Sequence, residues 1–188
     1  QHGPSSAAAR DIQILRSVFG NLYIAQNLKS SVSKNTVFFQ LPEDCNYIAY
    51  CDDFGPMNIS SIYRFIDALR DQLKASSGAS DKIIYKVERG RRALSNAVFM
   101  VGAYMLLEQG KSVQDIAGYF SWLDPSLVVG FRDATFNAVD FELSIADCWR
   151  GLAEGIRLGW LAPANAIAMG NHKQGRLDMR IYEHFNNP

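Results

Sequence analysis

The first half of the chain alternates between short apolar runs and polar breaks. Apolar, aromatic or β-branched residues dominate the stretches 22–25, 36–41 and 46–51. Turn-forming residues separate these stretches, and this pattern predicts three short β-strands. A fourth run, Lys82–Val87, is mostly apolar and short, so we expect it to be a strand buried within a sheet.

Helical periodicity replaces this pattern after the break at Gly55-Pro56, where Asn58 is the expected N-cap. Apolar residues from Ile59 to Leu73 recur on one face and predict a first helix, which ends in the loop 76–80. The next helix, Ala93–Glu108, is apolar around most of its circumference, so we expect it to be buried. A further apolar stripe follows the capping box of Ser112 and predicts a third helix. A final long helix is predicted from about Phe141. Its apolar stripe consists of Leu143, Ala146, Trp149, Ala153, Ile156 and Trp160.

Early strands, alternating helices and a central strand–turn–helix unit predict an α/β layered fold. The 188 residues fit one ordinary domain, which we place at 11–161. Residues 1–10 are small and polar without periodicity, so we interpret them as a disordered leader or a tag remnant. Residues 162–188 change in character and are predicted to be a linker or tail.

Composition and charge narrow the function classes. Nineteen basic and nineteen acidic residues cancel, so there is no electrostatic reason to expect nucleic-acid binding. No apolar run is long enough to predict membrane insertion. Cys45, Cys51 and Cys148 have no zinc-like spacing, and we interpret them as reduced thiols of an intracellular protein that needs no metal or other cofactor.

The central unit from Ile83 to Glu108 is the one place where chemistry is expected. A buried strand, a tight charged turn and a buried helix form a potential anion cradle, because a helix N-terminus offers unpaired N–H groups and partial positive charge. Two interpretations stay open: a site for phosphate or an acidic partner, or a solvated turn with no ligand. The candidate residues are Glu88, Arg89, Gly90, Arg91, Arg92, Ser95 and Asn96.

Catalysis of the cysteine-phosphatase type requires a thiol in such a loop and an arginine six positions later. No cysteine lies between Cys51 and Cys148, so we predict no catalytic residues and no phosphatase activity for this chain. Motifs of other enzyme classes are also missing. Asp52 and Asp53 are adjacent in a predicted strand and should point to opposite faces, so we expect capping or solvation instead of joint catalysis.

Several segments, in order, resemble the N-terminal, phosphatase-like domain of the cell-division-cycle-fourteen dual-specificity phosphatases. They are Asp53–Asn58 with Tyr63-Arg64, Asn96–Tyr104, Phe131–Phe136, and Leu143–Cys148 with Gly151 and Gly155. The resemblance covers roughly residues 11–161 and implies a cysteine-phosphatase-like fold, with a central mixed sheet flanked by helices and a degenerate active-site loop. On that template, Glu88 stands at the nucleophile position and Leu94 at the position of the phosphate-binding arginine.

The resemblance implies a catalytically inactive pseudophosphatase domain that serves protein binding or scaffolding. The alternative is the substrate-groove domain of a larger, active two-domain phosphatase, so the expected partner is a protein or an adjacent catalytic domain. An enzyme of an unrelated class is a third hypothesis, but no acid–base constellation is visible. The family's setting implies a location in the cytoplasm, in the nucleus or on the cytoskeleton.

Overall fold

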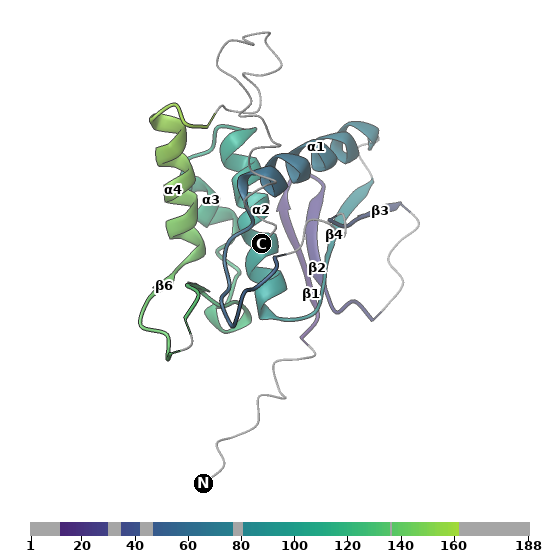
Figure 1. The fold of residues 1–188 in the computed structure, drawn as a ribbon. Helices are drawn as coiled ribbons and strands as arrows, with labels where there is room; N and C mark the ends of the chain where they lie inside the picture. The colour runs from purple at the N-terminus through teal and green to yellow at the C-terminus, as the bar shows by residue number, and fades with distance from the viewer. Residues whose placement is uncertain (1–11, 30–34, 42–46, 77–80, 136, 162–188) are drawn as a thin grey trace.

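A mixed β-sheet forms the centre of the protein. The structure, a computed structural model, describes residues 12–29, 35–41, 47–76, 81–135 and 137–161. The strand order is β1-β2-β4-β3, with β1 antiparallel to β2 and with both β2 and β3 parallel to β4 (Figure 1). These strands are β1 (Ile14–Phe19), β2 (Leu22–Gln26), β3 (Thr36–Phe39) and β4 (Lys82–Val87).

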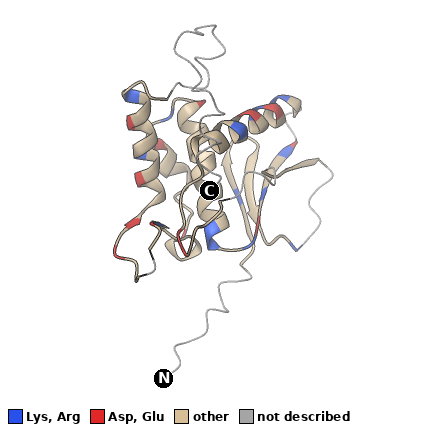
Figure 2. Ribbon diagram, in the orientation of Figure 1, with Lys and Arg blue, Asp and Glu red and all other residues tan. Residues whose placement is uncertain are grey.

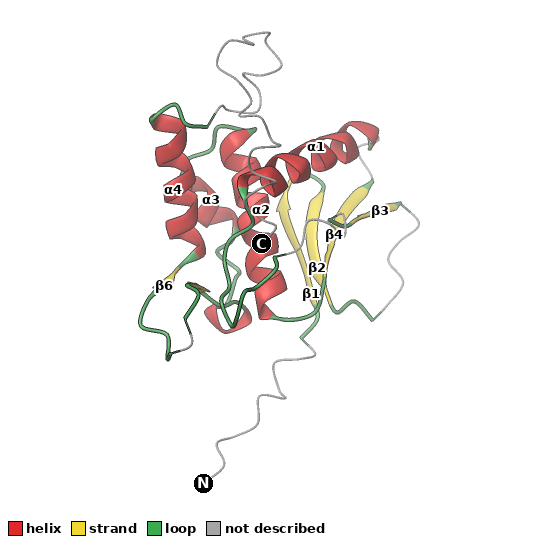
Figure 3. Ribbon diagram, in the orientation of Figure 1, coloured by secondary structure: helices red, strands yellow, loops and turns green. Residues whose placement is uncertain are grey.

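Helices flank this sheet, and Figure 3 shows them as a group beside the strands. They are α1 (Ile59–Ala75), α2 (Arg91–Leu107), α3 (Val113–Tyr119) and α4 (Ile145–Arg157). A short 3-10 turn, η2 (Pro125–Leu127), and a two-stranded sheet of β5 (Phe131–Arg132) and β6 (Glu142–Leu143) join α3 to α4. The predicted α/β fold, with a central mixed sheet flanked by helices, is confirmed.

The core lies between one face of the sheet and the helices. Side chains alternate along a strand, so Ile83, Tyr85 and Val87 of β4 share one face, and all three are buried. Phe65 of α1 packs on Tyr85 with ring centroids 5.3 Å apart. Tyr104 of α2 stacks on Phe19 of β1 at 5.7 Å. The two helices therefore cover the sheet from β3 to β1.

Helix α2 is the most buried element of the fold. Every residue from Leu94 to Leu107 is buried, as the apolar sequence around its circumference predicted. It packs against α1, α3 and α4 as well as against β4. Gly102 makes the contact with α4 possible, because the Trp149 indole lies directly over it, and the Trp149 Nε1 donates a hydrogen bond to the Phe99 carbonyl at 3.0 Å.

Capping residues fix the helix starts that the sequence predicted. The Asn58 side chain accepts the Ser61 N–H at 2.8 Å, and Ser112 and Asp115 form a reciprocal capping box. The last helix starts at Ile145 after the Ser144 cap, and the prediction of a start near Phe141 was wrong because Glu142-Leu143 pairs with β5 instead. Trp160 lies beyond the end of that helix and is exposed, so it does not belong to the buried stripe.

Two strand predictions also differ from the structure. Of the predicted strand 46–51, residues 47–51 are irregular, because the Cys51 N–H bonds to the Asp53 carboxylate and not to a neighbouring strand. Strand β1 was missed because only its first and fifth residues are buried, which hides the alternation of an edge strand. Residues 1–10 and 162–188 lie outside the described residues, so the domain boundaries remain predictions.

We predict that Gly102→Ala destabilises the protein even though alanine favours helices. A Cβ at position 102 would lie 2.2 Å from Cε2 of Trp149, an overlap that forces the α2–α4 contact apart. Overpacking of this kind costs roughly 1–3 kcal/mol, which outweighs the gain of about 1 kcal/mol in helix propensity. Chemical denaturation should therefore show a net loss of up to about 2 kcal/mol.

Gly151→Ala in α4 is the matched control, because a Cβ there meets no atom within 4 Å. That variant should be more stable than the parent by roughly 0.5–1 kcal/mol. Equal stability of the two alanine variants would contradict the close approach of Trp149 to α2.

Candidate functional site

A cavity of about 500 Å³ opens where β4 ends and α2 begins. Its walls come from the end of β3, the segment 47–57, the end of β4 and the first turns of α2. The carboxyl ends of parallel strands meet at this edge of the sheet, which is the usual place for a ligand site in α/β folds. The cavity is therefore the candidate functional site of the described residues.

The turn between β4 and α2 presents an uncapped helix N-terminus beside this cavity. Gly90 is the N-cap with φ of 108°, a conformation that side chains rarely adopt, and no side chain caps the first N–H groups of the helix. The Gln26 Nε2 donates hydrogen bonds to the carbonyls of Glu88 at 2.5 Å and Gly90 at 3.0 Å. This bracing from β2 holds the turn in place and leaves its N–H groups available.

Basic residues lie at the start of α2, where Figure 2 shows the ribbon in blue. The three arginines of the turn differ in their contacts. The Arg91 guanidinium turns away from the cavity and donates to the Val128 carbonyl. The Arg92 guanidinium donates to the Asp52 carboxylate at 2.7 Å. Arg89 lines the cavity and is exposed, and its side chain makes no hydrogen bond or ion pair within the described residues.

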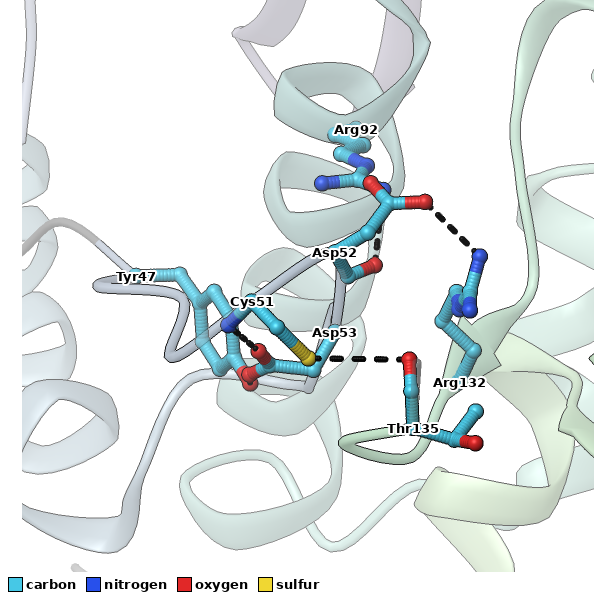
Figure 4. A network of polar contacts seen from close by, with 7 residues as sticks. All are labelled: Tyr47, Cys51, Asp52, Asp53, Arg92, Arg132 and Thr135. Atoms are coloured by element: carbon cyan, nitrogen blue, oxygen red, sulfur yellow. Dashed lines mark hydrogen bonds and ion pairs between the residues drawn. The ribbon is translucent and has the colours of Figure 1, made fainter. Parts of the chain in front are cut away.

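Asp52 bridges two elements in front of the helix (Figure 4). One carboxylate oxygen accepts from Arg92, and the other accepts from the Arg132 Nη1 of β5 at 2.8 Å. The Arg92 guanidinium also lies over the Phe54 ring, 5.3 Å from its centroid. These contacts fasten the segment 52–54 to α2 and to the small sheet, so this segment forms a fixed wall of the cavity.

Asp53 is buried and holds the same segment in place through hydrogen bonds. Its carboxylate accepts the Cys51 N–H at 2.7 Å and the Tyr47 hydroxyl at 2.5 Å (Figure 4). The Cys51 hydrogen bond, followed by that of Tyr47, lowers the pKa of Asp53 to about 2. Burial, followed by the hydrogen bond to Asp53, raises the pKa of Tyr47 to about 12. The pair is therefore a carboxylate and a neutral phenol near neutral pH.

Ser95 and Asn96 follow each other in α2, but only Asn96 lines the cavity. The Ser95 Oγ donates to the Val129 carbonyl at 2.8 Å and accepts its N–H at 2.9 Å, so Ser95 fastens the 128–129 segment and does not line the cavity. Asn96 lines the cavity, and its Nδ2 donates to the Gly55 carbonyl at 3.3 Å. The Asn96 Oδ1 is buried and has no hydrogen-bond partner among the described residues.

The structure therefore divides the predicted loop residues into two groups. Glu88, Arg89, Arg92 and Asn96 line the cavity, whereas Arg91 and Ser95 hold the 128–129 segment. Gly90 shapes the turn between them. The proposed anion site at this turn stays a prediction.

Sequence reasoning missed the other wall of the cavity. Tyr47, Phe54 and Met57 line it, although the segment was interpreted as a strand followed by a break. The argument that Asp52 and Asp53 point to opposite faces of a strand was wrong, because neither residue lies in a regular strand. The two carboxylates still act separately, one with Arg92 and Arg132 and the other with Tyr47 and Cys51.

The described thiols have surroundings that do not favour a nucleophile. The Cys51 Sγ lies 3.7 Å from the Thr135 carbonyl and does not line the cavity. Burial, followed by the charge of Asp147, raises the pKa of the Cys148 thiol to about 11, so it stays protonated near neutral pH. Cys45 lies outside the described residues.

Metal sites and membrane-spanning helices would leave recognisable features in the described part of the chain. There, no three histidine, cysteine, aspartate or glutamate side chains gather in a way that could hold a metal ion. None of the helices found there combines the length and the apolar character that crossing a membrane requires.

Comparison with known proteins places this chain in a family. Residues 16–155 match the family described as "Dual specificity protein phosphatase, N-terminal half". The chain is 32% identical over 133 residues to dual specificity protein phosphatase CDC14A of Homo sapiens, covering 70% of this chain and 22% of that protein.

Two further relatives agree with this match. Tyrosine-protein phosphatase CDC14 of Saccharomyces cerevisiae is 29% identical over 150 residues, covering 77% of this chain and 26% of that protein. Dual specificity protein phosphatase CDC14C of Symphalangus syndactylus is 24% identical over 177 residues, covering 81% and 36%. The chain thus spans less than two fifths of the length of these relatives.

We predict that the stability contributed by Asp53 is lost in acid. Its lowered pKa means that the folded state favours the carboxylate, so the contribution is present above the ordinary value of 3.8 and disappears as the pH falls toward about 2. Thermal unfolding of Asp53→Asn should show a lower Tm than the parent at pH 7, and the difference should shrink between pH 4 and pH 2.

Tyr47→Phe removes the donor to the same carboxylate and should cost about 1 kcal/mol at pH 7. Asp140→Asn is the control, because Asp140 is exposed and its removal should leave the Tm unchanged at every pH. A constant gap between parent and Asp53→Asn from pH 7 to pH 2 would rule out the depressed pKa.

Proposed function

The chain belongs to the family formed by the N-terminal halves of dual specificity protein phosphatases, and from this premise we propose that it is a catalytically inactive phosphatase-like domain that binds a protein partner. The setting that we propose is intracellular: the cytoplasm, the nucleus or the cytoskeleton. This proposed location rests only on the family resemblance and on the interpretation of the cysteines as reduced thiols.

The observation that carries the proposal is the chemistry at the two key positions of the central loop. Glu88, at the nucleophile position implied by the resemblance, offers a carboxylate where a thiolate would be needed. Leu94, at the position of the phosphate-binding arginine, is fully buried in the core and carries no charge. At these two positions the chain has neither the thiol nor the arginine that cysteine-based phosphoryl transfer needs.

The architecture around that loop nevertheless remains intact, which supports a role in binding. Gln26 still braces the turn, and α2 is still buried along its length. These contacts give the turn a defined shape, which supports a role in binding. A domain that keeps its fold in this way fits a scaffold or a partner-binding module.

A second candidate function has its own support, namely the share of the relatives that this chain covers. At least 64% of each relative described above lies outside the matched region, and the matching family is named for an N-terminal half. We therefore propose as the alternative that this chain is the substrate-groove half of a larger two-domain phosphatase. In that case the partner is the adjacent catalytic domain.

The surface near β6 and the start of α4 is the binding face that we propose for such a partner. Phe141 and Leu143 are apolar and remain 59% and 38% exposed. Beside them lies a groove of about 730 Å³, with walls from α3, η2, β6 and α4, and the apolar side chains Leu123, Val128 and Ile145 line it. Exposed apolar groups next to a groove are typical of an interaction surface.

We predict that the chain alone does not hydrolyse 4-nitrophenyl phosphate. The expected rate equals that of buffer, since the central loop has no thiol and Leu94 replaces the arginine. Human CDC14A is the positive control, and release of nitrophenolate is followed by absorbance. Turnover by the purified chain that disappears in Glu88→Gln would contradict the proposal.

We predict that Leu143→Asp weakens binding to a phosphatase catalytic half. The probe is the C-terminal remainder of human CDC14A, produced as a separate polypeptide, and affinity is measured by calorimetry. Loss of an apolar anchor and introduction of a charge should weaken binding about tenfold or more. Phe38→Asp is the matched control, because Phe38 is equally apolar and 52% exposed but lies on β3. A larger loss in the control variant would place the interface on the sheet edge instead.

A further inference from the structure

We propose that the face of the central sheet opposite α1 and α2 is a docking surface for an acidic amphipathic helix of a partner protein. This inference goes beyond the proposed function, because it adds a second surface, which shares no residue with the groove beside α4, and states the chemistry of its partner. Its support comes from an exposed apolar surface, two lysines and the parallel direction of three strands.

Two rows of side chains make up this surface, which we call the open sheet face. Residues that lie opposite each other on neighbouring strands point to the same face of a sheet. Ile84 of β4 lies opposite both Tyr23 of β2 and Phe38 of β3, so these three side chains form one row across the sheet. The next row along the strands consists of Leu15, Ala25 and Lys86.

No described helix covers the open sheet face. Helix α1 packs on Tyr85 and α2 packs on Phe19, which both point to the opposite face, whereas α3 and α4 pack on α2. The hydrophobic core lies on that opposite face and includes neither Ala25 nor Ile84, although both are fully buried. These two residues are therefore the centre of a separate, small apolar cluster.

The direction of the strands makes an uncovered face unusual. Strands β2 and β3 both run parallel to β4, and parallel strands almost always have both faces covered. Leu15 and Phe38, on the two outer strands of the sheet (Figure 1), remain 42% and 52% exposed. Exposed apolar side chains on both sides of a buried centre are typical of an interaction surface.

The width of the open sheet face suits a single helix. Neighbouring strands lie about 4.8 Å apart, so the outer strands β1 and β3 are about 14 Å apart. A helix with its side chains is about 10–12 Å wide. One helix therefore fits between Leu15 and Phe38 and covers Ile84, and helices are the usual cover of a parallel sheet.

A hollow at one end of the open sheet face offers room for an anchoring side chain. Its volume is about 620 Å³, and Ala25 and Lys86 line it together with Leu28 and Gln40, which follow β2 and β3. Partner side chains that fill such hollows commonly contribute most to binding.

The charge of the open sheet face favours an acidic partner. Lys82 and Lys86 lie two residues before and after Ile84, so both point to this face, and both are exposed. The Lys82 Nζ lies over the Tyr23 ring, 5.3 Å from its centroid. None of the described strand positions on this face is acidic. Complementary charges select the partner and speed its association.

Other occupants suit this surface less well. A second copy of the chain, related by a two-fold axis, would bring lysines close to lysines. Residues 1–11 contain no large apolar side chain. The segment 162–188 has an excess of basic residues, namely Lys173, Arg176 and Arg180 against Asp178 and Glu183. The lysines of the open sheet face therefore favour a helix from another protein.

The experiment uses the full chain and a designed, fluorescently labelled peptide of about 18 residues, long enough for a helix of about 27 Å. Its leucines form one stripe, glutamates flank that stripe and alanines fill the remaining positions. A matched peptide has lysine in place of every glutamate. Fluorescence anisotropy at low salt should show that the acidic peptide binds about tenfold or more tightly than the basic one. Absence of binding by the acidic peptide, or equal binding of the two peptides, would overturn the proposal.

Three variants locate the surface. Phe38→Asp and Lys86→Glu should each weaken binding of the acidic peptide about tenfold, and Lys86→Glu should also reduce the preference for the acidic over the basic peptide. Leu143→Asp is the matched control, because Leu143 is also apolar and exposed but lies on β6, and it should leave the affinity unchanged. Equal losses in all three variants would mean nonspecific binding and would overturn the surface.

Thermal melts show whether each variant folds. Phe38, Lys86 and Leu143 are exposed, so each variant should melt close to the parent. Leu15→Asp, on the opposite edge of the same face, serves as a second variant if Phe38→Asp lowers the Tm, and it should weaken binding in the same way.

Failure of this inference can be distinguished from failure of the proposed function. Binding of the catalytic half depends on Leu143 and binding of the acidic peptide depends on Phe38, so each result stands without the other. Sedimentation of the full chain tests for a second copy. A dimer that is lost in Phe38→Asp would assign the open sheet face to self-association and would overturn the acidic partner.

Discussion

Burial of α2 along almost its whole length is the constraint on which the rest of this structure depends. A helix that is apolar on all sides needs partners on all sides, and β4, α1, α3 and α4 provide them. Gly102 admits the Trp149 indole so that α4 can approach, and Tyr104 stacks on β1. The rest of the helix is enclosed, and its N-terminus lies at the edge of the sheet where β4 ends.

Around that N-terminus, hydrogen bonds and ion pairs hold the turn before α2 and the segment 52–54 in place. Gln26 holds the turn from one side, and Asp52 joins Arg92 to Arg132 on the other. Asp53 binds Tyr47 and the Cys51 N–H and thereby keeps an irregular segment in one conformation. One wall of the cavity is thus held by polar contacts of Tyr47 and Arg92, which both line it.

The family supplies the context for this arrangement. The chain matches the N-terminal half of dual specificity phosphatases, and its sheet, turn and buried helix form a phosphatase-like frame. At the two positions that the resemblance assigns to a thiol and an arginine, the chain has Glu88 and Leu94.

The sequence by itself determined the fold class, the helices and the caps of Asn58 and Ser112, because periodicity and capping are local properties. It also showed that no cysteine stands in the central loop. Only the tertiary structure decided that Arg91 turns to Val128, and that residues 47–54 are an irregular segment held by polar contacts and not a strand. Partners such as Asp52 and Arg132 lie 80 positions apart, and no local pattern encodes a contact between residues that only folding brings together.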